Sequence, residues 1–330
     1  MKNTIKRRKF IKTAVGAGLA MSMPTPWLTS CISSRFDAKG LPVSILGKTG
    51  VTVPRIALGC GSRFCAIPNE DEAQKLLITA LDNGLYYWDT AHSYQDTKTG
   101  VKSEERLGRV VKDRRNEIFL VSKVDSRNPE EAKRELEQSL KLLHTDKLDV
   151  LMIHAVESEE EVEQMGKKGQ LIDFVQQMKS EGVADFIGCS GHGSARALKK
   201  IADRGDFDCI MMAMNHWGEK HGFKREELAV PAALRQNMGV MLMKAIRPKD
   251  NIPEISPESL IRYALSLDGP TGITVGMDSM EVLESNLKIL RSFKPLSKEE
   301  KNRISEIIAP FFRNEGLEWM NSSYRDGFWG

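Results

Sequence analysis

Cysteine is scarce in this sequence, and no two cysteines have the spacing of a metal or iron–sulfur site. The 330 residues contain five cysteines, at positions 31, 60, 65, 189 and 209. None forms a Cys-x-x-Cys pair, the usual signature of zinc sites and of iron–sulfur clusters. The cysteine pattern therefore gives no support for either kind of framework, and we expect no metal site.

Long hydrophobic runs and an overall basic body are also missing. No run is long and apolar enough to span a bilayer. The formal net charge is +3, but residues 1–30 carry six Lys or Arg residues and no acidic residue, which leaves −3 for residues 31–330. A mildly acidic body argues against nucleic-acid binding, which needs a basic stripe. With 41% hydrophobic and 28% charged residues, a folded core is expected.

The basic start of the chain has the order of elements of a twin-arginine export signal. Residues 6–12 read Lys-Arg-Arg-Lys-Phe-Ile-Lys, and a modestly apolar stretch, residues 13–23, follows. This order is typical of such signals, and a disordered basic arm is the alternative. Residues 1–30 are therefore predicted to be a signal peptide read by the twin-arginine machinery. That machinery moves proteins already folded in the cytosol, so no disulfide framework is expected at the oxidising destination.

A cysteine follows the predicted signal directly. Leu28-Thr29-Ser30-Cys31 resembles the lipobox at which bacterial lipoproteins are cleaved before an acylated Cys. An ordinary cleavage site with an incidental Cys is the alternative. Acylation of Cys31 predicts a protein anchored in a membrane on the periplasmic side. Residues 31–42 are then a linker, and residues 43–330 are the folded domain.

Strand-like and helix-like stretches alternate after residue 40 with the repeat of an eight-fold barrel. Residues 55–59 supply a first strand-like run, and the later runs end 25 to 36 residues apart. A (β/α)8 TIM barrel of about 250 residues needs about 31 residues per unit. An open doubly wound sheet is the alternative, but residues 59–62 lack the third glycine of its phosphate loop. The later strand-like runs end near residues 89, 123, 154, 190, 215, 244 and 276.

Two appendages are predicted at the ends of the barrel. Residues 41–54 turn at Lys48-Thr49-Gly50 and predict a β-hairpin that plugs the bottom of the barrel. Residues 297–330 predict a C-terminal helix over 298–312 and then an aromatic tail. Amphipathic spacing predicts helices over residues 70–83, 129–143, 171–181, 195–204, 226–236, 258–267 and 280–291.

Four polar residues lie at or just beyond the ends of apolar runs: Asp89, Tyr94, Lys123 and His154. Catalytic groups of TIM barrels lie at the C-terminal ends of the strands. Carbonyl reduction needs a proton on oxygen, and a Tyr hydroxyl, with an ordinary pKa of about 10, can donate it when an ammonium stabilises the phenolate. None of these residues supplies a hydride, so a nicotinamide cofactor must.

The sequence closely resembles the aldo-keto reductase superfamily from about residue 43 to residue 290. The resemblance rests on several short motifs rather than on one. They are Leu46-Gly47-Lys48-Thr49-Gly50, Gly84-x4-Asp89-Thr90-Ala91-x2-Tyr94, Ser103-Glu104-x2-Leu107-Gly108, Ser122-Lys123, Ile153-His154 and Ile187-Gly188-Cys189-Ser190.

The resemblance implies an oxidoreductase that interconverts an aldehyde or ketone with an alcohol, using NADP(H) or NAD(H). It makes Tyr94 the general acid/base, Lys123 the residue that lowers the pKa of Tyr94, Asp89 the partner of Lys123, and His154 the residue that orients the carbonyl. The implied cofactor contacts are Ser190, Asn215, Lys244 and Asn286. The predicted substrate pocket takes Trp217, Trp319 and Trp329 from loops and the tail.

The sequence departs from the family pattern at the cofactor and at the mouth of the barrel. Gln95 replaces the Gly that usually follows the catalytic Tyr, and the loop over residues 96–102 is longer than usual. Gly191 stands where an Asn usually follows Ser190. Of the positions that usually hold the NADP 2′-phosphate and adenine, residues 277, 278, 282, 285 and 286, only Asn286 is kept, so NADP and NAD both stay open.

Two other functions are alternatives to the enzyme. A metal-dependent hydrolase barrel would gather the histidines at positions 92, 154, 192 and 216, but its first strand usually carries two histidines and residues 55–59 carry none. A redox-sensing or partner protein that binds NAD(P) without turnover would keep the same residues. A carbonyl reductase with a Tyr–Lys–Asp–His site is the preferred interpretation.

Overall fold

Eight parallel strands close into a barrel in the computed structural model, which describes residues 35–192, 194–213, 225–247, 252, 254–313 and 328–329. Each strand pairs with its neighbour in the chain, and the ring closes where Gly276 lies opposite Gly59. The predicted (β/α)8 TIM barrel is confirmed. Its strands are β3 (Ile56–Gly59), β4 (Tyr87–Asp89), β6 (Phe119–Val124), β7 (Leu148–Ile153), β8 (Ala184–Gly191), β9 (Cys209–Ala213), β10 (Gly239–Met243) and β11 (Gly272–Gly276).

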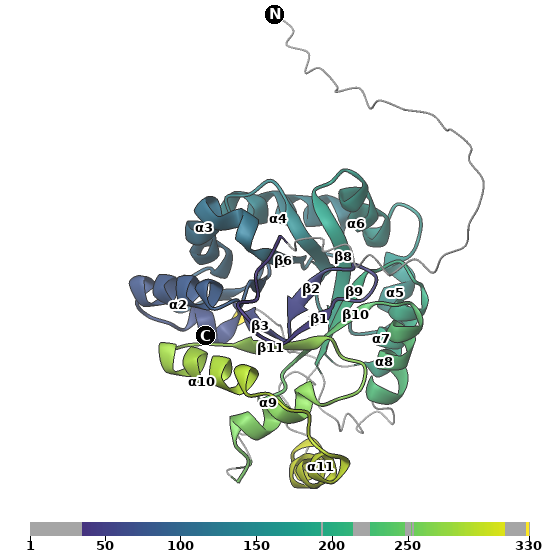
Figure 1. Ribbon diagram of the computed structural model, residues 1–330. Helices are drawn as coiled ribbons and strands as arrows, with labels where there is room; N and C mark the ends of the chain where they lie inside the picture. The colour runs from purple at the N-terminus through teal and green to yellow at the C-terminus, as the bar shows by residue number, and fades with distance from the viewer. Residues whose placement is uncertain are drawn as a thin grey trace, which may run out of the picture. The chain divides into compact units, whose positions relative to one another are not determined.

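Helices surround the barrel on the outside (Figure 1). Each pair of neighbouring parallel strands is joined by a crossover connection that contains a helix. The helices cover the outer faces of the strands, whose inner faces pack inside the barrel. The crossovers contain α2 (Glu70–Asp82), α3 (Ser103–Arg114), α4 (Pro129–Leu142), α6 (Leu171–Ser180), α7 (Ala195–Asp203), α8 (Arg225–Arg235), α9 (Pro257–Leu265) and α10 (Met280–Arg291). Shorter elements are α1 (Ser62–Cys65), α5 (Glu159–Met165) and the 3-10 helix η1 (Arg115–Glu117).

Capping residues determine where several helices begin. Because the loops at the C-terminal end of the barrel run from a strand to the next helix, the same residues determine where those loops end. Asn69 accepts hydrogen bonds from the backbone N–H groups of the first turn of α2, and Asn128 does the same for α4. Ser158 forms a capping box with Glu161 at α5. These side chains satisfy N–H groups that a helix leaves without intrahelical partners, so the loop lengths over the barrel mouth follow from local sequence.

Helix α3 was not predicted, because polar residues occupy positions that it buries. Ser103, Glu104 and Arg106 are buried at its start, ahead of the apolar Leu107, and this hides the usual spacing of hydrophobic residues. Gly108 lets α3 lie against α4, since a Cβ atom there would be 2.0 Å from the carbonyl oxygen of Leu142. Burial of polar groups in α3 is explained by their partners inside the protein.

A β-hairpin closes the N-terminal end of the barrel, as predicted. Strands β1 (Val43–Ile45) and β2 (Thr52–Pro54) pair antiparallel, and Figure 1 shows the hairpin across the ring of strands. Gly47, with φ of +50°, forms a bridge to Met238 just before β10, where its missing Cβ would lie 2.2 Å from the nitrogen of Gly239. Leu46 is fully buried beside this bridge. The plug leaves the opposite end of the barrel for a site.

Residues 35–42, which precede the hairpin, contact the same end of the barrel. The ring of Phe36 stacks on Tyr86 with 5.0 Å between ring centroids. Arg35 donates a hydrogen bond to the carboxylate of Asp149, at the start of β7. The part of the predicted linker that the structure describes is therefore held against the barrel.

The C-terminal extension consists of α11 (Lys298–Arg313), which contacts α9, and the short strand β12 (Phe328–Trp329). Strand β12 pairs in parallel with β5 (Gln95–Asp96), the two residues that follow Tyr94. The predicted C-terminal helix is confirmed within one residue at its end. The pairing places the backbone of Trp329 next to Asp96, at the C-terminal end of the barrel.

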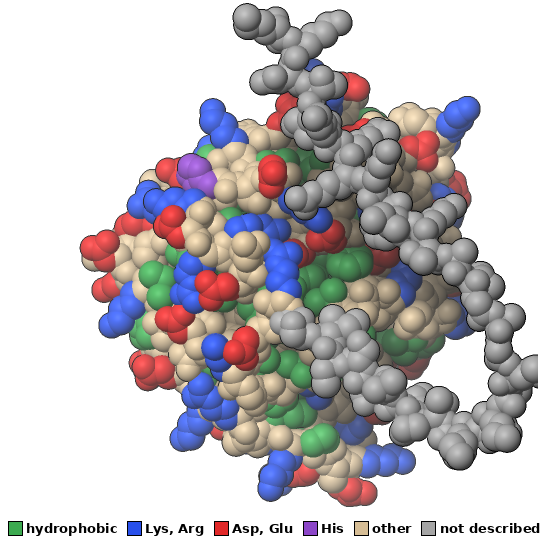
Figure 2. Space-filling model, turned by 45° about the horizontal axis from the view of Figure 1, so that its top comes forward, with side chains coloured by type: hydrophobic (Ala, Val, Ile, Leu, Met, Phe, Trp, Pro, Cys, Tyr) green, Lys and Arg blue, Asp and Glu red, His purple; other side chains and the backbone are tan. Residues whose placement is uncertain are grey.

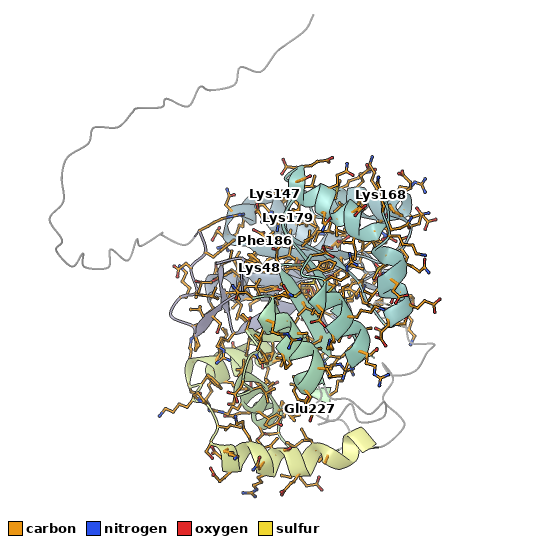
Figure 3. All side chains as sticks on the ribbon, turned by 90° about the vertical axis from the view of Figure 1, so that its right-hand side faces the viewer. Lys48, Lys147, Lys168, Lys179, Phe186 and Glu227 are labelled. Atoms are coloured by element: carbon orange, nitrogen blue, oxygen red, sulfur yellow. The ribbon has the colours of Figure 1, made fainter. Side chains whose placement is uncertain are left out.

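Charged side chains of both signs are mixed over the surface. On the face that Figure 2 shows, Lys and Arg side chains alternate with Asp and Glu. At the N-terminal end of the barrel, Lys179 pairs with Asp208 at 2.6 Å and lies over the ring of Phe186, near Lys147 (Figure 3). Among the described residues, no helix combines the length and apolar character needed to cross a membrane.

Candidate active site

Four buried polar side chains meet at the end of the barrel opposite the hairpin. Asp89 is the last residue of β4, Lys123 is the second-last residue of β6, and His154 follows β7 directly. Tyr94 comes from the loop after β4 and is 7% exposed, while the other three are at most 3% exposed. The structure therefore brings together the four residues that the sequence singled out.

Lys123 and Asp89 form a buried ion pair. The Nζ atom of Lys123 donates to Asp89 Oδ1 at 2.8 Å and to the carbonyl oxygen of Thr90 at 2.7 Å. The same Nζ atom lies 4.8 Å from the centroid of the Tyr94 ring. An ammonium held between a carboxylate and a phenol ring stabilises negative charge on that phenol.

The loop that carries Tyr94 is fixed by its own backbone. The N–H of Tyr94 donates to the carbonyl oxygen of Ala91 at 3.1 Å, and its carbonyl accepts from the N–H of Ser103 at 2.9 Å, at the start of α3. The rings of Tyr94 and His154 meet edge to face, with 5.5 Å between centroids. Tyr94 is thus placed between an ammonium and an imidazole.

Asp125 belongs to the same group of side chains, although the sequence analysis did not select it. Its Oδ1 atom lies 2.7 Å from His154 Nδ1 and accepts a hydrogen bond from Ser93 Oγ at 2.9 Å. Burial raises the pKa of the Asp125 carboxyl, but the hydrogen bonds from His154 and Ser93 and the charges of His154 and His92 together lower that pKa by more, so the net shift is downward. Its position in the sequence could have identified it, because Asp125 directly follows β6 and so lies at the same end of the barrel as the other site residues.

A cleft of about 110 Å³, open to solvent, includes Asp89 and Tyr94 in its wall. The remaining wall comes from β3, β9, β10 and β11, from the start of α1 and from the loops after β3 and β10. Three cationic residues line it: Arg63, Lys244 and Arg247. Arg63 also pairs with Asp278 at 2.7 Å, just beyond β11. The cleft therefore joins Asp89 and Tyr94 to a wall that carries cationic side chains.

Lys244 lies where the sequence placed it, one residue past β10. Its φ of +64° is a left-handed conformation that residues other than Gly seldom adopt. Strain of this kind persists where surrounding structure holds it, and it gathers at ligand sites. Lys244 is the one predicted cofactor residue among those that line this cleft.

Ser190 and Asn286 are buried elsewhere around the barrel. Ser190 Oγ accepts a hydrogen bond from the N–H of Ala155 at 3.1 Å, which steadies the turn after His154. Asn286, on α10, is 4% exposed, and its Nδ2 atom has no hydrogen-bond partner among the described residues. A buried amide without a partner is costly and needs an explanation.

Several predicted residues lie outside the part of the chain that the structure describes. These are Cys31, Asn215, Trp217 and Trp319. Trp329 is described through its backbone in β12 alone. Their predicted roles stay predictions.

The histidines near the barrel mouth contact different partners. His92 Nδ1 lies 3.4 Å from Ser139 Oγ, His154 contacts Asp125, and His192 Nδ1 lies 3.3 Å from Glu157 Oε1. His216 lies outside the described residues. Within the described ranges, no group of three or more His, Cys, Asp or Glu side chains could hold a metal ion. The four cysteines at 60, 65, 189 and 209 are buried free thiols.

Glu104, on α3, is a buried carboxyl directly behind the strand that carries Lys123. It accepts a hydrogen bond from Ser122 Oγ at 2.6 Å. Burial raises the pKa of Glu104 to about 7, and the hydrogen bond from Ser122 offsets only part of that rise. The folded-state pKa lies above the ordinary value of 4.5, so the unfolded chain loses its proton first as the pH rises.

We expect this carboxyl to make the protein less stable as the pH rises from about 4.5 to about 7. The loss of unfolding free energy from this group reaches about 3 kcal/mol. Glu104→Gln cannot ionise and removes that part of the pH dependence, which urea unfolding at pH 5 and pH 8 measures. Glu105→Gln, at the exposed neighbouring position, is the matched control and should keep the wild-type slope. Equal slopes in wild type and Glu104→Gln would refute a neutral buried Glu104.

The chain matches the sequence model of the Aldo/keto reductase family over residues 55–248. It is 26% identical over 179 residues to the "Uncharacterized oxidoreductase YqkF" of Bacillus subtilis, a match that covers 51% of this chain and 54% of that protein. It is 33% identical over 109 residues to glycerol 2-dehydrogenase (NADP(+)) of Saccharomyces cerevisiae, which covers 32% of this chain and 31% of that protein. The chain thus spans about half of the first relative and less than a third of the second.

One curated relative matches over nearly its whole length. L-galactose dehydrogenase of Arabidopsis thaliana is 22% identical over 328 residues, covering 85% of this chain and 98% of that protein.

Solved structures resemble the fold of this chain. An aldo-keto reductase from Bacillus halodurans, in its holo form, superposes with a TM-score of 0.66 at 20% identity, covering 81% of this chain and 96% of that one. An aldo-keto reductase from Klebsiella pneumoniae in complex with NADPH superposes with a TM-score of 0.63 at 21% identity, covering 81% and 95%. At these identities the likeness concerns the fold alone.

Proposed function

The chain belongs to the aldo/keto reductase family, and from that premise we propose that it is an NAD(P)-dependent oxidoreductase that interconverts an aldehyde or ketone with an alcohol. One observation carries the proposal. Asp89 and Tyr94 line an open cleft, and the buried Lys123 ammonium lies between the Asp89 carboxylate, at 2.8 Å, and the ring of Tyr94, at 4.8 Å. This arrangement suits a phenol that gives up and regains a proton.

Tyr94 is proposed to be the general acid/base. In the reducing direction its hydroxyl donates a proton to the carbonyl oxygen of the substrate as that oxygen gains negative charge. The ammonium of Lys123 stabilises the phenolate left behind, and Asp89 holds the ammonium in place. In the oxidising direction the phenolate takes the proton back from the alcohol. His154, edge to face with Tyr94, orients the substrate oxygen.

The residues around the cleft fit a nicotinamide dinucleotide. Arg63, Lys244 and Arg247 supply positive charge where a pyrophosphate needs it. Asn286 has a buried amide nitrogen without a partner in the described part of the protein, on the helix that follows β11, and an adenine ring supplies acceptors for such a donor. Ser190, buried at the end of β8, is proposed to contact the nicotinamide amide. When bound, the cofactor supplies the hydride.

The substrate is proposed to contact the C-terminal tail. Strand β12 lies beside β5, and β5 begins one residue after Tyr94. The pairing brings the chain around Trp329 to the loop that carries the proton donor. We propose that the tail, with the loop over residues 96–102, limits which carbonyl compounds reach Tyr94. Trp217 and Trp319 are proposed to line the same pocket.

Turnover by the purified protein tests the proposed function. Loss of NADPH or NADH absorbance is measured with a panel of aldehydes, ketones and sugars, and nucleotide binding is measured separately by fluorescence. Oxidation of either nucleotide that depends on a carbonyl compound supports the enzyme. Tight nucleotide binding without turnover on any compound would instead support a binding or sensing protein.

We further propose that the protein is exported and anchored. The twin arginines at positions 7 and 8 and the lipobox ending at Cys31 support residues 1–30 as a signal peptide and membrane attachment through acylated Cys31.

Replacing both Arg7 and Arg8 by Lys is expected to keep the protein in the cytosol, because the export machinery reads the arginine pair rather than the total charge. Cys31→Ala is expected to move the exported protein from the membrane to the soluble periplasmic fraction. Cell fractionation and immunoblotting measure both results. Wild-type protein found soluble in the cytosol would overturn this assignment.

A further inference from the structure

We propose that Asp125 is a positioning residue for the reaction, which holds the imidazole of His154 in one orientation and in its charged form through Nδ1. The proposal rests on the proposed function, because it concerns the same site. Asp125 acts through His154 and does not need to touch the substrate.

The geometry around Asp125 is closely constrained. Its Oδ1 atom is 2.7 Å from His154 Nδ1, and His154 is 1% exposed. The same Oδ1 atom accepts from the hydroxyl of Ser93, the residue before Tyr94, at 2.9 Å. One carboxylate oxygen therefore links the imidazole to the loop that carries the proposed proton donor.

The backbone on both sides of this contact is also fixed. Arg127 donates to the carbonyl oxygens of Asp125 at 2.8 Å and of His154 at 2.7 Å. The N–H of Asp125 donates to Glu135 Oε2 at 2.7 Å. A guanidinium that bridges the ends of β6 and β7 keeps the carboxylate and the imidazole at hydrogen-bond distance before any substrate binds. Such preorganisation is what positions a catalytic group.

The charges around the pair favour an imidazolium. A carboxylate in contact with an imidazole stabilises the protonated ring. His154 in turn lowers the pKa of the Asp125 carboxyl against the opposing effect of burial, so Asp125 stays charged. Ser93 donates to the carboxylate and His92 adds to the lowering.

The other charged groups near Asp125 and His154 have partners of their own, so they do not alter the preference for a charged His154 ring. Arg127 pairs with Glu161 as well as with the backbone. Lys123, beyond Tyr94, pairs with Asp89, and Glu135 accepts from backbone N–H groups. The Asp125 carboxylate contacts the His154 ring directly, at 2.7 Å from Nδ1.

The consequence for the reaction concerns which ring nitrogen meets the substrate. With Nδ1 held by Asp125, any hydrogen bond from His154 to the substrate oxygen must come from Nε2. A charged ring donates a stronger hydrogen bond than a neutral one. His154 then polarises the carbonyl while Tyr94 delivers the proton, and reduction slows when the ring loses its charge.

Asp125→Asn tests this assignment, with Asp125→Glu as the conservative variant. Asp208→Asn, whose carboxylate pairs with Lys179 at the opposite end of the barrel, is the matched control. We expect Asp125→Asn to lower kcat for reduction about tenfold or more near neutral pH, with a smaller change in KM. The alkaline limb of the pH profile should move to lower pH by about one unit or more, because the ring loses its proton more readily. Asp125→Glu should restore part of kcat, and Asp208→Asn should keep the wild-type limb.

A second measurement does not depend on turnover. Nitrogen NMR of protein labelled in its histidines, with the His154 signals assigned by their loss in His154→Gln, reports protonation of each ring nitrogen. We expect both nitrogens of His154 to be protonated at pH 7 in wild type and Nε2 to lose its proton in Asp125→Asn. Circular dichroism checks that the variant is folded.

The outcomes separate this proposal from the proposed function. A neutral His154 in wild type, or a wild-type pH profile in Asp125→Asn, overturns the role of Asp125. Absence of turnover in wild type overturns the proposed function, while the NMR result still decides whether Asp125 sets the charge and orientation of His154.

Discussion

Tyr94→Phe is expected to lower kcat for carbonyl reduction about a thousandfold, because it removes the one hydroxyl proposed to donate the proton. The phenyl ring that remains can keep its place over the Lys123 ammonium, at 4.8 Å, and against His154, at 5.5 Å. Folding and nucleotide binding should therefore stay close to wild type. Steady-state kinetics at saturating carbonyl measure kcat, and a fluorescence titration measures the Kd of the nucleotide.

Tyr86→Phe is the matched control for this change. Tyr86 is also buried, but its hydroxyl donates to the carbonyl oxygen of Thr52 in the hairpin, at the opposite end of the barrel. Its loss should cost stability and leave kcat almost unchanged. Turnover by Tyr94→Phe at the wild-type rate would remove Tyr94 from the mechanism, and with it the proposed role of the tetrad.

The second large effect is expected from Lys123→Met, which removes the ammonium between Asp89 and Tyr94. Without it the phenolate of Tyr94 is less stable, so kcat should fall about a hundredfold or more. In the direction of alcohol oxidation, the activity that remains should rise only at higher pH than in wild type, since the phenolate forms less readily. The pH profile of alcohol oxidation measures this shift.

Lys123→Met should also destabilise the fold. Asp89, 3% exposed, would be left as a buried charge without its ion-pair partner. Removing one partner of a buried pair costs about 3–5 kcal/mol. The double variant Lys123→Met/Asp89→Asn should recover much of that stability in urea unfolding without recovering kcat.

Lys179→Met provides a control at the far end of the barrel. Lys179 pairs with Asp208 at 2.6 Å, and its side chain is partly exposed (Figure 3). Loss of this pair should leave kcat near wild type. A double variant that regains activity together with stability would show that Lys123 matters for folding alone.

The barrel and the location of its site could be predicted from the sequence because both follow from local patterns. Short apolar runs of the length of a strand predict strands that are buried on both faces, and in this sequence several of these runs end at a polar residue. Since parallel strands in a barrel all end on one face, Asp89, Lys123 and His154 had to meet there once the fold was known. The predicted helices lie within two residues of the observed bounds, and Asn69, Asn128 and Ser256 cap the starts of α2, α4 and α9.

Residues that depend on packing were not predictable in the same way. Helix α3 was missed because it buries Ser103, Glu104 and Arg106, whose partners come from other elements. The ordinary spacing of hydrophobic residues says nothing about a carboxyl such as Glu104, which is buried against Ser122 of a neighbouring strand.

The sequence by itself determined that the chain forms a (β/α)8 barrel with a hairpin at one end and four polar residues at the other, because local hydrophobic patterns specify strands, helices and their ends. Only the tertiary structure decided which side chains touch. Asp125 contacts His154 across 29 positions of sequence, Arg63 pairs with Asp278, and β12 adds to β5 beside Tyr94. Such contacts depend on strand register and on how the loops pack over the barrel, and no local pattern encodes either.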